Sequence, residues 1–307
     1  MIKITKPGVY ASIQDLGREQ KEKDGLSESG ALNYRAMMLA NKMVGNPLEY
    51  PTIEMTIIGV EFEVLKDVVV AIFGTEKIEL NNKVTSTHTW IHLKEGDYVI
   101  VGRLLDTRGY IAVKGRIESK CLFGSQSVHS QVNLIPPLAA GDVIKTDYSV
   151  VKKELRKLPK RQIVQLPKVK RLKGKPIIRV MLGEDAYRIK NLHDFFNTPY
   201  KIHRDSNRMA IRLSGRPLEA SNYDILSDTT RLGLLQVAKN GEPMILMNDR
   251  QTTGGYLRLG TIARVDIPIL VDLRIQSEVY FEEITIEEAR QLYIKEMERI
   301  KGEYYLP

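Results

Sequence analysis

Short apolar runs broken by Gly, Pro and Asp recur along most of this 307-residue chain, and they constrain its fold more than any other feature. The runs are rich in Val, Ile and Tyr, and several alternate apolar with polar residues, as half-buried strands do. Examples are residues 61–74, 97–105, 109–115, 176–183 and 209–215. Strands at such short intervals are typical of barrels and sandwiches rather than of βαβ units. The sequence therefore predicts a mainly β fold with few helices.

Two segments have the pattern of helices. In residues 31–44 apolar side chains recur at helical spacing, with Ser29 as the expected N-cap and Gly45-Asn46-Pro47 as the stop. Near the C-terminus Glu288 follows Thr285 by three residues, which is the spacing of a capping box. We therefore expect one helix in the N-terminal half and one at the end of the chain.

The net charge of +8 comes from one segment. Eleven of the 46 Lys and Arg residues lie between Val151 and Lys175, against a single acid, Glu154. No aromatic residue lies among these charges to stack on a base. The pattern favours a solvated linker over a surface for an acidic partner, and it does not favour nucleic acid as a partner.

This linker divides the chain. We expect a β-rich domain over 1–150, the basic linker over 151–175, a second β-rich domain over 176–284 and a C-terminal helix over 285–307. The chain has no apolar stretch of signal-peptide or membrane-spanning length, which predicts a cytoplasmic protein that does not enter a membrane.

Cysteine and histidine give no sign of a metal site. The single cysteine, Cys121, cannot form an intramolecular disulfide, and its apolar neighbours Leu122 and Phe123 predict a small buried side chain. His88 and His92 are four residues apart in a strand-like run without an H-E-x-x-H motif, so a role on a strand face or in the core is favoured over zinc. We expect no bound metal, and the chain has no Gly-rich nucleotide-binding motif of its own.

The strongest candidate for chemistry is the segment DRQTTGGY, which follows a strand-like run. Asp249 can transfer a proton or hold an amide N–H, and Arg250 offers a planar fork to a carboxylate or phosphate. Gln251, Thr252 and Thr253 add neutral donors and acceptors, Gly254 and Gly255 let the backbone pass close to a ligand, and Tyr256 ends the segment. The alternative is a polar hairpin turn, but so many consecutive hydrogen-bonding or permissive residues exceed what a turn requires.

Other polar loops are weaker candidates. Asn207 and Arg208 lie in the loop before the strand 209–215, where an ion pair between Asp205 and Arg208 is an equally good explanation. In the N-terminal half the candidates are Gln14, Asp15 and Arg18 around Gly17, Ser29 before the first helix, and Ser125 in FGSQSVHS. The N–H groups at the start of that helix can hold an anion, although capping explains much of the same pattern.

Taken in order, QDLGR (14–18), SGALN (29–33), GSQS (124–127), DSNRM (205–209) and DRQTTGGY (249–256) are similar to the motifs of one family. The chain resembles the allophanate hydrolase subunit 2 family, also called the biotin-dependent carboxyltransferase-like family, from Ile4 to about Glu283. Its stand-alone bacterial members include the C-type subunit of the ATP-dependent 5-oxoprolinase. The resemblance implies two tandem cyclophilin-like β-barrels.

The resemblance also implies an activity and partners. The chain would be a subunit of an ATP-dependent amidohydrolase that opens 5-oxo-L-proline to L-glutamate. Its partners would be a subunit-B-type protein, similar to allophanate hydrolase subunit 1, and a third subunit. ATP, with Mg²⁺, would act at the level of the complex. Asp249, Arg250 and Gln251 would be catalytic. The residues that would bind the substrate are Gln14, Asp15, Arg18, Ser29, Ser125, Asn207, Arg208, Thr252, Thr253, Gly254, Gly255 and Tyr256.

Some positions differ from the family pattern. Asn33 replaces an acid, Ala210 replaces a Gly, Arg116 replaces a Gly and Gln126 replaces an Arg. Two other functions within the family therefore stay open. One is the carboxyltransferase half-site of a biotin-dependent urea or allophanate system, although no biotin attachment sequence of the A-M-K-M type occurs here. The other is a non-catalytic regulator that binds the inhibitor of a sensor kinase.

Overall fold

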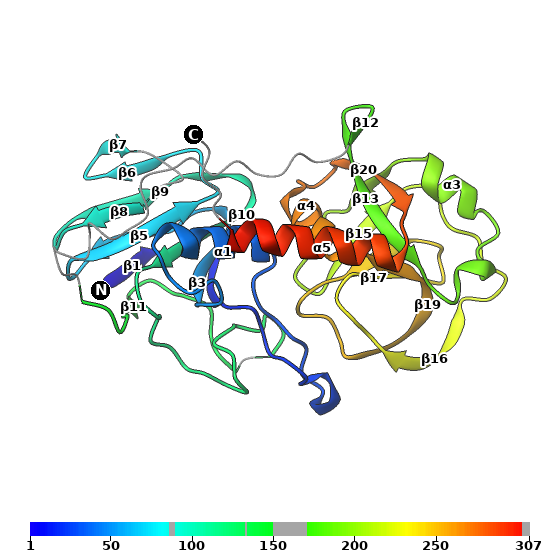
Figure 1. The fold of residues 1–307 in the computed structure, drawn as a ribbon, viewed down its shortest axis with the longest axis horizontal. Helices are drawn as coiled ribbons and strands as arrows, with labels where there is room; N and C mark the ends of the chain where they lie inside the picture. Colours follow the sequence, from blue (N-terminus) through cyan, green and yellow to red (C-terminus); the bar gives the residue numbers. More distant parts are fainter. Residues whose placement is uncertain (86–89, 133, 150–170, 303–307) are drawn as a thin grey trace. The chain divides into compact units, whose positions relative to one another are not determined.

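The computed structural model describes residues 1–85, 90–132, 134–149 and 171–302, drawn as a coloured ribbon in Figure 1. The chain divides into two compact units. The described residues of unit 1 fall within Met1–Glu19 and Ser29–Gln165, and those of unit 2 fall within Gln20–Glu28 and Leu166–Gly302. The segment Gln20–Glu28 thus belongs to unit 2, although the residues on both sides of it in the sequence belong to unit 1.

Unit 1 is built from two antiparallel sheets. The six-stranded sheet has the order β11-β1-β4-β9-β6-β7, and its strands are β1 (Ile2–Lys6), β4 (Glu61–Val64), β6 (Ile78–Leu80), β7 (Lys83–Thr85), β9 (Tyr98–Val101) and β11 (Val143–Ile144). The five-stranded sheet has the order β2-β3-β10-β5-β8, and its strands are β2 (Tyr10–Gln14), β3 (Thr52–Ile58), β5 (Val68–Phe73), β8 (Trp90–Leu93) and β10 (Arg103–Val113).

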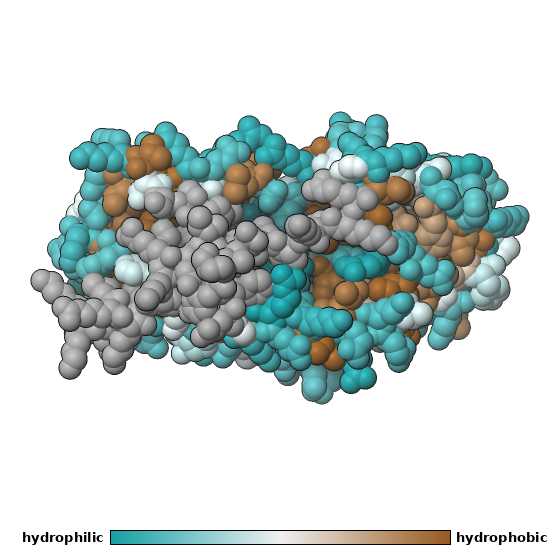
Figure 2. Space-filling model, turned by 45° about the horizontal axis from the view of Figure 1, so that its top comes forward, coloured by the Kyte–Doolittle hydropathy of each residue, from teal (hydrophilic) through white to brown (hydrophobic). Residues whose placement is uncertain are grey.

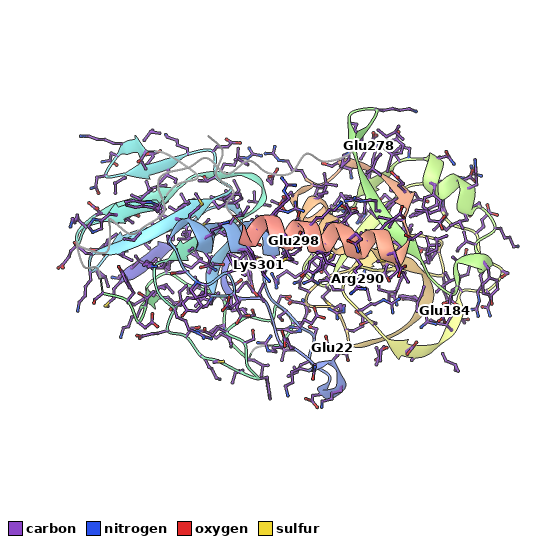
Figure 3. The ribbon with its side chains drawn as sticks, viewed as in Figure 1. Glu22, Glu184, Glu278, Arg290, Glu298 and Lys301 are labelled. Atoms are coloured by element: carbon purple, nitrogen blue, oxygen red, sulfur yellow. The ribbon has the colours of Figure 1, made fainter. Side chains whose placement is uncertain are left out.

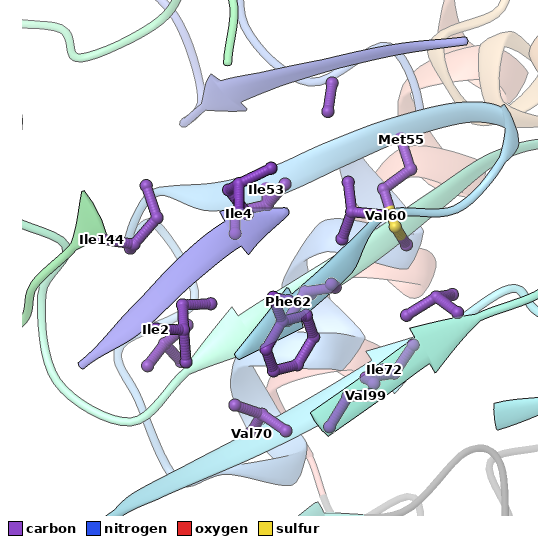
Figure 4. Close-up of a cluster of buried hydrophobic side chains, with 14 of the residues drawn as sticks. Ile2, Ile4, Ile53, Met55, Val60, Phe62, Val70, Ile72, Val99 and Ile144 are labelled. Carbon is purple, nitrogen blue, oxygen red and sulfur yellow. The ribbon is translucent and has the colours of Figure 1, made fainter. Parts of the chain in front are cut away.

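The core of unit 1 is formed by apolar side chains of both sheets. Strands β4, β8 and β9 alternate buried with half-buried residues, so each turns one row of side chains inward. Ile4 and Phe62 from one sheet join Ile53 and Ile72 from the other in a single cluster, shown in Figure 4. Burying this cluster is the main driving force for the fold of the unit.

Helix α1 (Tyr34–Met43) packs against β10, β5 and β3 of unit 1. Its N-cap is Asn33, whose Oδ1 accepts a hydrogen bond from the N–H of Ala36 at 2.9 Å. The prediction that Ser29 caps this helix was therefore wrong. Ser29 is buried, has a φ of 54° in the left-handed region, and lies four residues before the N-cap.

Unit 2 contains a nine-stranded sheet with the order β12-β13-β20-β14-β15-β18-β17-β19-β16. Its strands are β12 (Arg171–Leu172), β13 (Lys175–Leu182), β14 (Tyr200–Ile202), β15 (Ala210–Ser214), β16 (Asp224–Thr229), β17 (Leu234–Val237), β18 (Pro243–Leu246), β19 (Thr253–Ile262) and β20 (Glu278–Glu283). Because β19 also pairs with β13, part of this sheet closes into a ring. The ring has the order β13-β20-β14-β15-β18-β17-β19.

Five short helices and one longer helix, α5, complete unit 2. They are η1 (Glu22–Asp24), η2 (Ala186–Arg188), α3 (Leu192–Asn197), η3 (Arg264–Asp266), α4 (Ile267–Asp272) and α5 (Ile286–Lys301). Phe195 of α3 stacks on Phe281 of β20 with ring centroids 4.6 Å apart. The expected capping box is present at the start of α5, where Thr285 and Glu288 bond to each other's backbone.

The mainly β fold predicted from the sequence is confirmed. The predicted strand 61–74 is interrupted by a turn, because Leu65, Lys66 and Asp67 separate β4 from β5. Of the predicted linker, residues 151–170 lie outside the described residues, and 171–175 form β12, a turn at Lys173 and Gly174, and the first residue of β13.

Hydrophilic residues cover most of the coloured surface in Figure 2, with smaller hydrophobic patches between them. Exposed apolar side chains include those of Leu172, Ile275 and Ile286. Scattered apolar residues of this kind are normal on protein surfaces. Among the described residues, no helix has the length and apolar character needed to span a membrane.

Candidate functional site

Asp15 is the centre of a buried hydrogen-bond network in unit 1. Its Oδ1 accepts hydrogen bonds from the hydroxyls of Ser125 and Ser127 at 2.6 and 2.5 Å, and from the N–H of Gly17 at 2.8 Å. Its Oδ2 accepts one from the N–H of Gln126 at 2.7 Å. The structure therefore brings the QDLGR and GSQS segments together, and the Asp15 carboxylate is satisfied by groups of the protein itself.

The neighbours of Asp15 extend this network. Gln14 donates to the hydroxyl of Ser12 and to the carbonyl of Val128, both at 3.0 Å. Arg18, which is 1% exposed, donates to the carbonyl of Ser127 at 2.5 Å. These side chains hold the loop between β2 and α1 against the loop that contains Ser127.

Two of the positions that differ from the family pattern contact each other. The Nε of Arg116 donates to the Oε1 of Gln126 at 3.1 Å, and the Nε2 of Gln126 donates to the carbonyl of Ile117 at 2.7 Å. Gln126 is 3% exposed, so the two substitutions form an internal contact of unit 1.

The backbone N–H groups just before α1 also donate hydrogen bonds to side chains of unit 1. The carboxylate of Glu54 accepts from the N–H of Leu32 at 2.8 Å and from the hydroxyl of Tyr110 at 2.7 Å. The hydroxyl of Tyr110 accepts from the N–H of Asn33 at 2.8 Å, and burial raises the pKa of Tyr110 well above its ordinary value. Of the two explanations given for this segment, the structure favours capping over anion binding.

Gly30 and Ala31 pack against the QDLGR segment. A Cβ on Gly30, whose φ is 88°, would lie 2.8 Å from the carbonyl carbon of Leu16 and 2.9 Å from the nitrogen of Gly17. The glycine lets the two loops approach each other, and Ala31 closes the contact by donating its N–H to the carbonyl of Asp15 at 2.9 Å.

Cys121 does not have the predicted environment. It is exposed, and its neighbour Phe123 is 53% exposed, so the apolar residues beside Cys121 lie in a surface loop and do not form a buried segment. The expectation for His92 is confirmed, since it lies on β8 with its Nε2 3.6 Å from the carboxylate of Asp67. His88 lies outside the described residues. Within the described ranges, His, Cys, Asp and Glu form no group that could hold a metal ion.

The DRQTTGGY segment joins β18 to β19 in unit 2, and its first residue is buried. Asp249 is 1% exposed and forms a two-bonded ion pair with Arg208, with Nε to Oδ2 at 2.8 Å and Nη2 to Oδ1 at 3.2 Å. The suggested pair between Asp205 and Arg208 was wrong, because Asp205 lies beside His203 and Arg204 instead. This ion pair between Arg208 and Asp249 holds the DSNRM and DRQTTGGY segments together.

Arg250 is 2% exposed and lies beside two carboxylates that sequence reasoning did not single out. Its Nη2 is 3.4 Å from Oε1 of Glu28 and 3.5 Å from Oε1 of Glu22. Figure 3 shows Glu22 on the short helix η1, within the part of unit 2 contributed by residues 20–28. The Nε and Nη1 of Arg250 are buried without a hydrogen-bond partner among the described residues. Burial lowers the pKa of Arg250 from its ordinary value, and the two glutamates oppose that effect.

Asn207, Gln251 and Tyr256 line one pocket of about 550 Å³ on unit 2. The pocket lies over β15 and β18, where Ala210 pairs with Leu246 and Arg212 with Met244. Its complete lining is Asn207, Met209, Ala210, Arg212, Ala238, Lys239, Asn240, Glu242, Met244, Leu246, Gln251 and Tyr256. It combines an apolar floor with a polar rim, which is typical of small-molecule sites.

The remaining residues of the segment begin β19. Thr253 and Gly254 pair with Thr229 and Asp228 of β16. Thr252 accepts a backbone hydrogen bond from Thr230 at 2.9 Å, and the Thr230 hydroxyl donates to the carbonyl of Gln251. Gly255 follows in the same strand. The segment is therefore held along its length, with Gln251 and Tyr256 left at the pocket.

The sequence candidates thus fall into two groups. Those of unit 1 are Gln14, Asp15, Arg18, Ser29 and Ser125, and all are buried. Those of unit 2 are Asn207, Arg208 and the segment 249–256, of which three residues line the pocket.

Comparison with known proteins places this arrangement in a family. The chain is 31% identical over 297 residues to the C-type subunit of 5-oxoprolinase from Escherichia coli, covering 94% of this chain and 93% of the relative. It is 27% identical to the C-type subunit of 5-oxoprolinase from Haemophilus influenzae, covering 100% and 96%. It is 26% identical to the urea amidolyase of Lachancea kluyveri, covering 94% of this chain and 17% of that protein.

A solved structure agrees in fold. The crystal structure of the Kluyveromyces lactis urea amidolyase matches 100% of this chain with a TM-score of 0.89 at 24% identity, and this chain spans 20% of that protein. The carboxyltransferase domain, subdomain A and B, family matches residues 24–283. The resemblance inferred from the motifs is therefore confirmed, and the chain belongs to the carboxyltransferase domain, subdomain A and B, family.

Proposed function

We propose that this chain is a subunit of an ATP-dependent 5-oxoprolinase, which opens 5-oxo-L-proline to L-glutamate together with a subunit-B-type partner and a third subunit. The observation that carries the proposal is the match, over nearly the whole length of both proteins, to the C-type subunit of 5-oxoprolinase. The urea amidolyase relative, by contrast, is matched over only 17% of its length.

The pocket on unit 2 supports a small amide as the substrate. Its volume of about 550 Å³ lies within the range of small-molecule sites, roughly 300–1,000 Å³. The carboxamides of Asn207 and Gln251 can exchange hydrogen bonds with a lactam, and Met244 and Leu246 offer apolar contact to its ring. Lys239, which is exposed at the pocket, suits the carboxylate of 5-oxoproline.

The geometry suggests different roles for the two charged residues of the segment. Asp249 accepts two hydrogen bonds from Arg208 in a buried ion pair, so we propose that it positions the loop instead of transferring a proton. Arg250 has two donors not used within the described residues, and we propose that it binds an anionic group of the reaction. ATP supplies the driving force for opening an unstrained lactam.

The test is an assay of the assembled complex. The chain is purified with its subunit-B-type partner and the third subunit, and glutamate and ADP are measured with and without 5-oxoproline. We expect ATP hydrolysis that depends on 5-oxoproline, with Gln251→Leu losing most of it. Gln291→Leu is the control, because Gln291 is exposed on α5. ATP hydrolysis unaffected by 5-oxoproline in the wild-type complex would contradict the proposal.

A second candidate function rests on the family itself. The match to the carboxyltransferase domain and to the urea amidolyase favours carboxyl transfer to urea or a similar amide. This function requires a biotinyl carrier from another protein. Transfer of labelled bicarbonate that depends on such a carrier, in place of glutamate formation, would establish it.

A further inference from the structure

The lining of the pocket on unit 2 includes three charged side chains, those of Arg212, Lys239 and Glu242. Arg212 of β15 pairs with Met244 of β18, and Glu242 lies two residues before Met244. Side chains at such diagonal positions of a strand pair lie about 7–8 Å apart. Lys239 belongs to the turn that joins β17 to β18. Two positive charges and one negative charge therefore gather in one part of the pocket.

Two of these charged groups are available to a ligand. Within the described part of the chain, the guanidinium of Arg212 and the carboxylate of Glu242 form no hydrogen bond or ion pair, either with each other or with another residue. Lys239, by contrast, lies 2.9 Å from the carboxylate of Asp224. Both Arg212 and Glu242 are exposed, so a molecule in the pocket can reach them without displacing a partner within the protein.

The carboxylate of Glu242 does not suit the closed lactam. 5-Oxoproline carries one negative charge and no positive charge, so a carboxylate in the pocket wall repels it. Ring opening changes the charges of the bound molecule. Water adds across the amide in a step driven by ATP hydrolysis: its oxygen joins the carbonyl carbon as the C–N bond breaks, and both of its protons end on the nitrogen. The neutral amide thus becomes a carboxylate and an ammonium, and glutamate carries two negative charges and one positive charge.

We propose that Glu242 binds the ammonium of L-glutamate and that Arg212 binds the carboxylate created by ring opening. This inference rests on the proposed function and names the contacts that the same pocket makes with the product. Lys239 keeps the carboxylate that is present before and after ring opening. Two cations and one anion of the pocket wall then match two anions and one cation of the product, and each contact is a charge-assisted hydrogen bond.

The test measures calorimetric binding of three compounds to the full chain, alone and in the assembled three-subunit complex. The compounds are L-glutamate, 5-oxo-L-proline and glutarate, which has both carboxylates of glutamate but no ammonium. We expect the wild type to bind L-glutamate about 10-fold more tightly than either other compound, because only L-glutamate offers a partner to all three charges of the pocket.

Two variants assign the contacts. Glu242→Gln should weaken the binding of L-glutamate by about 10-fold, remove its advantage over glutarate, and slightly tighten the binding of 5-oxo-L-proline, because a repelling charge is gone. Arg212→Gln should weaken the binding of L-glutamate and glutarate more than that of 5-oxo-L-proline. Glu298→Gln, the same change of charge at an exposed position of α5, is the control and should bind all three compounds as the wild type does. Thermal unfolding of each variant checks that the fold is retained.

Wild-type binding of glutarate as tight as that of L-glutamate, or an equal loss of both in Glu242→Gln, would overturn the inference. The turnover assay of the same complexes separates this inference from the proposed function. A preference for L-glutamate that depends on Glu242, without ATP hydrolysis that depends on 5-oxoproline, would reject the proposed function and retain the role of Glu242. Turnover without that preference would do the opposite. Absence of both would reject both.

Discussion

Each unit of this protein contains a buried aspartate from a motif of its family, and the two are satisfied in different ways. In unit 1 Asp15 accepts hydrogen bonds from two serine hydroxyls and two backbone N–H groups. In unit 2 Asp249 is bound by the guanidinium of Arg208. The sequence predicted a catalytic role for Asp249 and substrate binding for Asp15, and both carboxylates are engaged by the protein itself.

The two networks should differ in how much free energy of unfolding is lost when the carboxylate is removed. Removing the carboxylate of Asp15 leaves neutral donors unpaired, whereas neutralising Asp249 leaves a buried positive charge on Arg208, which is 6% exposed. Taking a charged partner away from a buried charge costs more than taking an acceptor away from a neutral donor. The two units should therefore respond unequally to the same kind of substitution.

The largest effect is expected for Asp249→Asn. It should lower the free energy of unfolding of unit 2 by about 3–5 kcal/mol, because the Arg208 guanidinium loses its buried counter-ion. Hydrogen exchange of the β15 and β18 amides in unit 2 measures this loss separately from unit 1. The double variant Arg208→Met/Asp249→Leu should recover much of the stability. If it is less stable than the single variant, the pair itself is not the cause.

A smaller effect is expected for Asp15→Ala. It should destabilise unit 1 by about 2 kcal/mol, because the hydroxyls and N–H groups around Asp15 lose a charged acceptor. Exchange of the Ser125–Ser127 amides should increase more than exchange in unit 2. A loss of free energy of unfolding larger than that caused by Asp249→Asn would contradict the expectation that losing a charged partner costs more than losing neutral ones.

The sequence predicted the strand-rich fold because alternation and turn residues are local signals. It also selected segments that the structure brings together, such as QDLGR with GSQS, although nothing in the spacing of Asp15 and Ser127 shows that they touch. The cap of α1 was misplaced because Ser29 and Asn33 are both good capping residues, and only the observed bond from the Ala36 N–H to Asn33 decides between them.

The residues missed from the sequence were hidden for physical reasons. Glu22 and Glu28 lie in a charged stretch of the kind that is typical of solvent-exposed segments. Their contact with Arg250 joins parts of the chain more than two hundred residues apart, which no local pattern predicts.

The smallest effect concerns the carboxylates beside Arg250 and sharpens the contrast between charged and neutral partners. Glu22→Gln/Glu28→Gln should cost about 1 kcal/mol, because both glutamates are partly exposed and their attraction to Arg250 is reduced by solvent.

The same variant should be stabilised by inorganic phosphate more than the wild type is, since Arg250 keeps its donors while losing its carboxylate neighbours. Thermal unfolding with and without phosphate measures both effects. Glu184→Gln/Glu298→Gln, which makes the same change of charge at two exposed positions labelled in Figure 3, is the control. If that control gains as much from phosphate, the gain reflects overall charge and not Arg250.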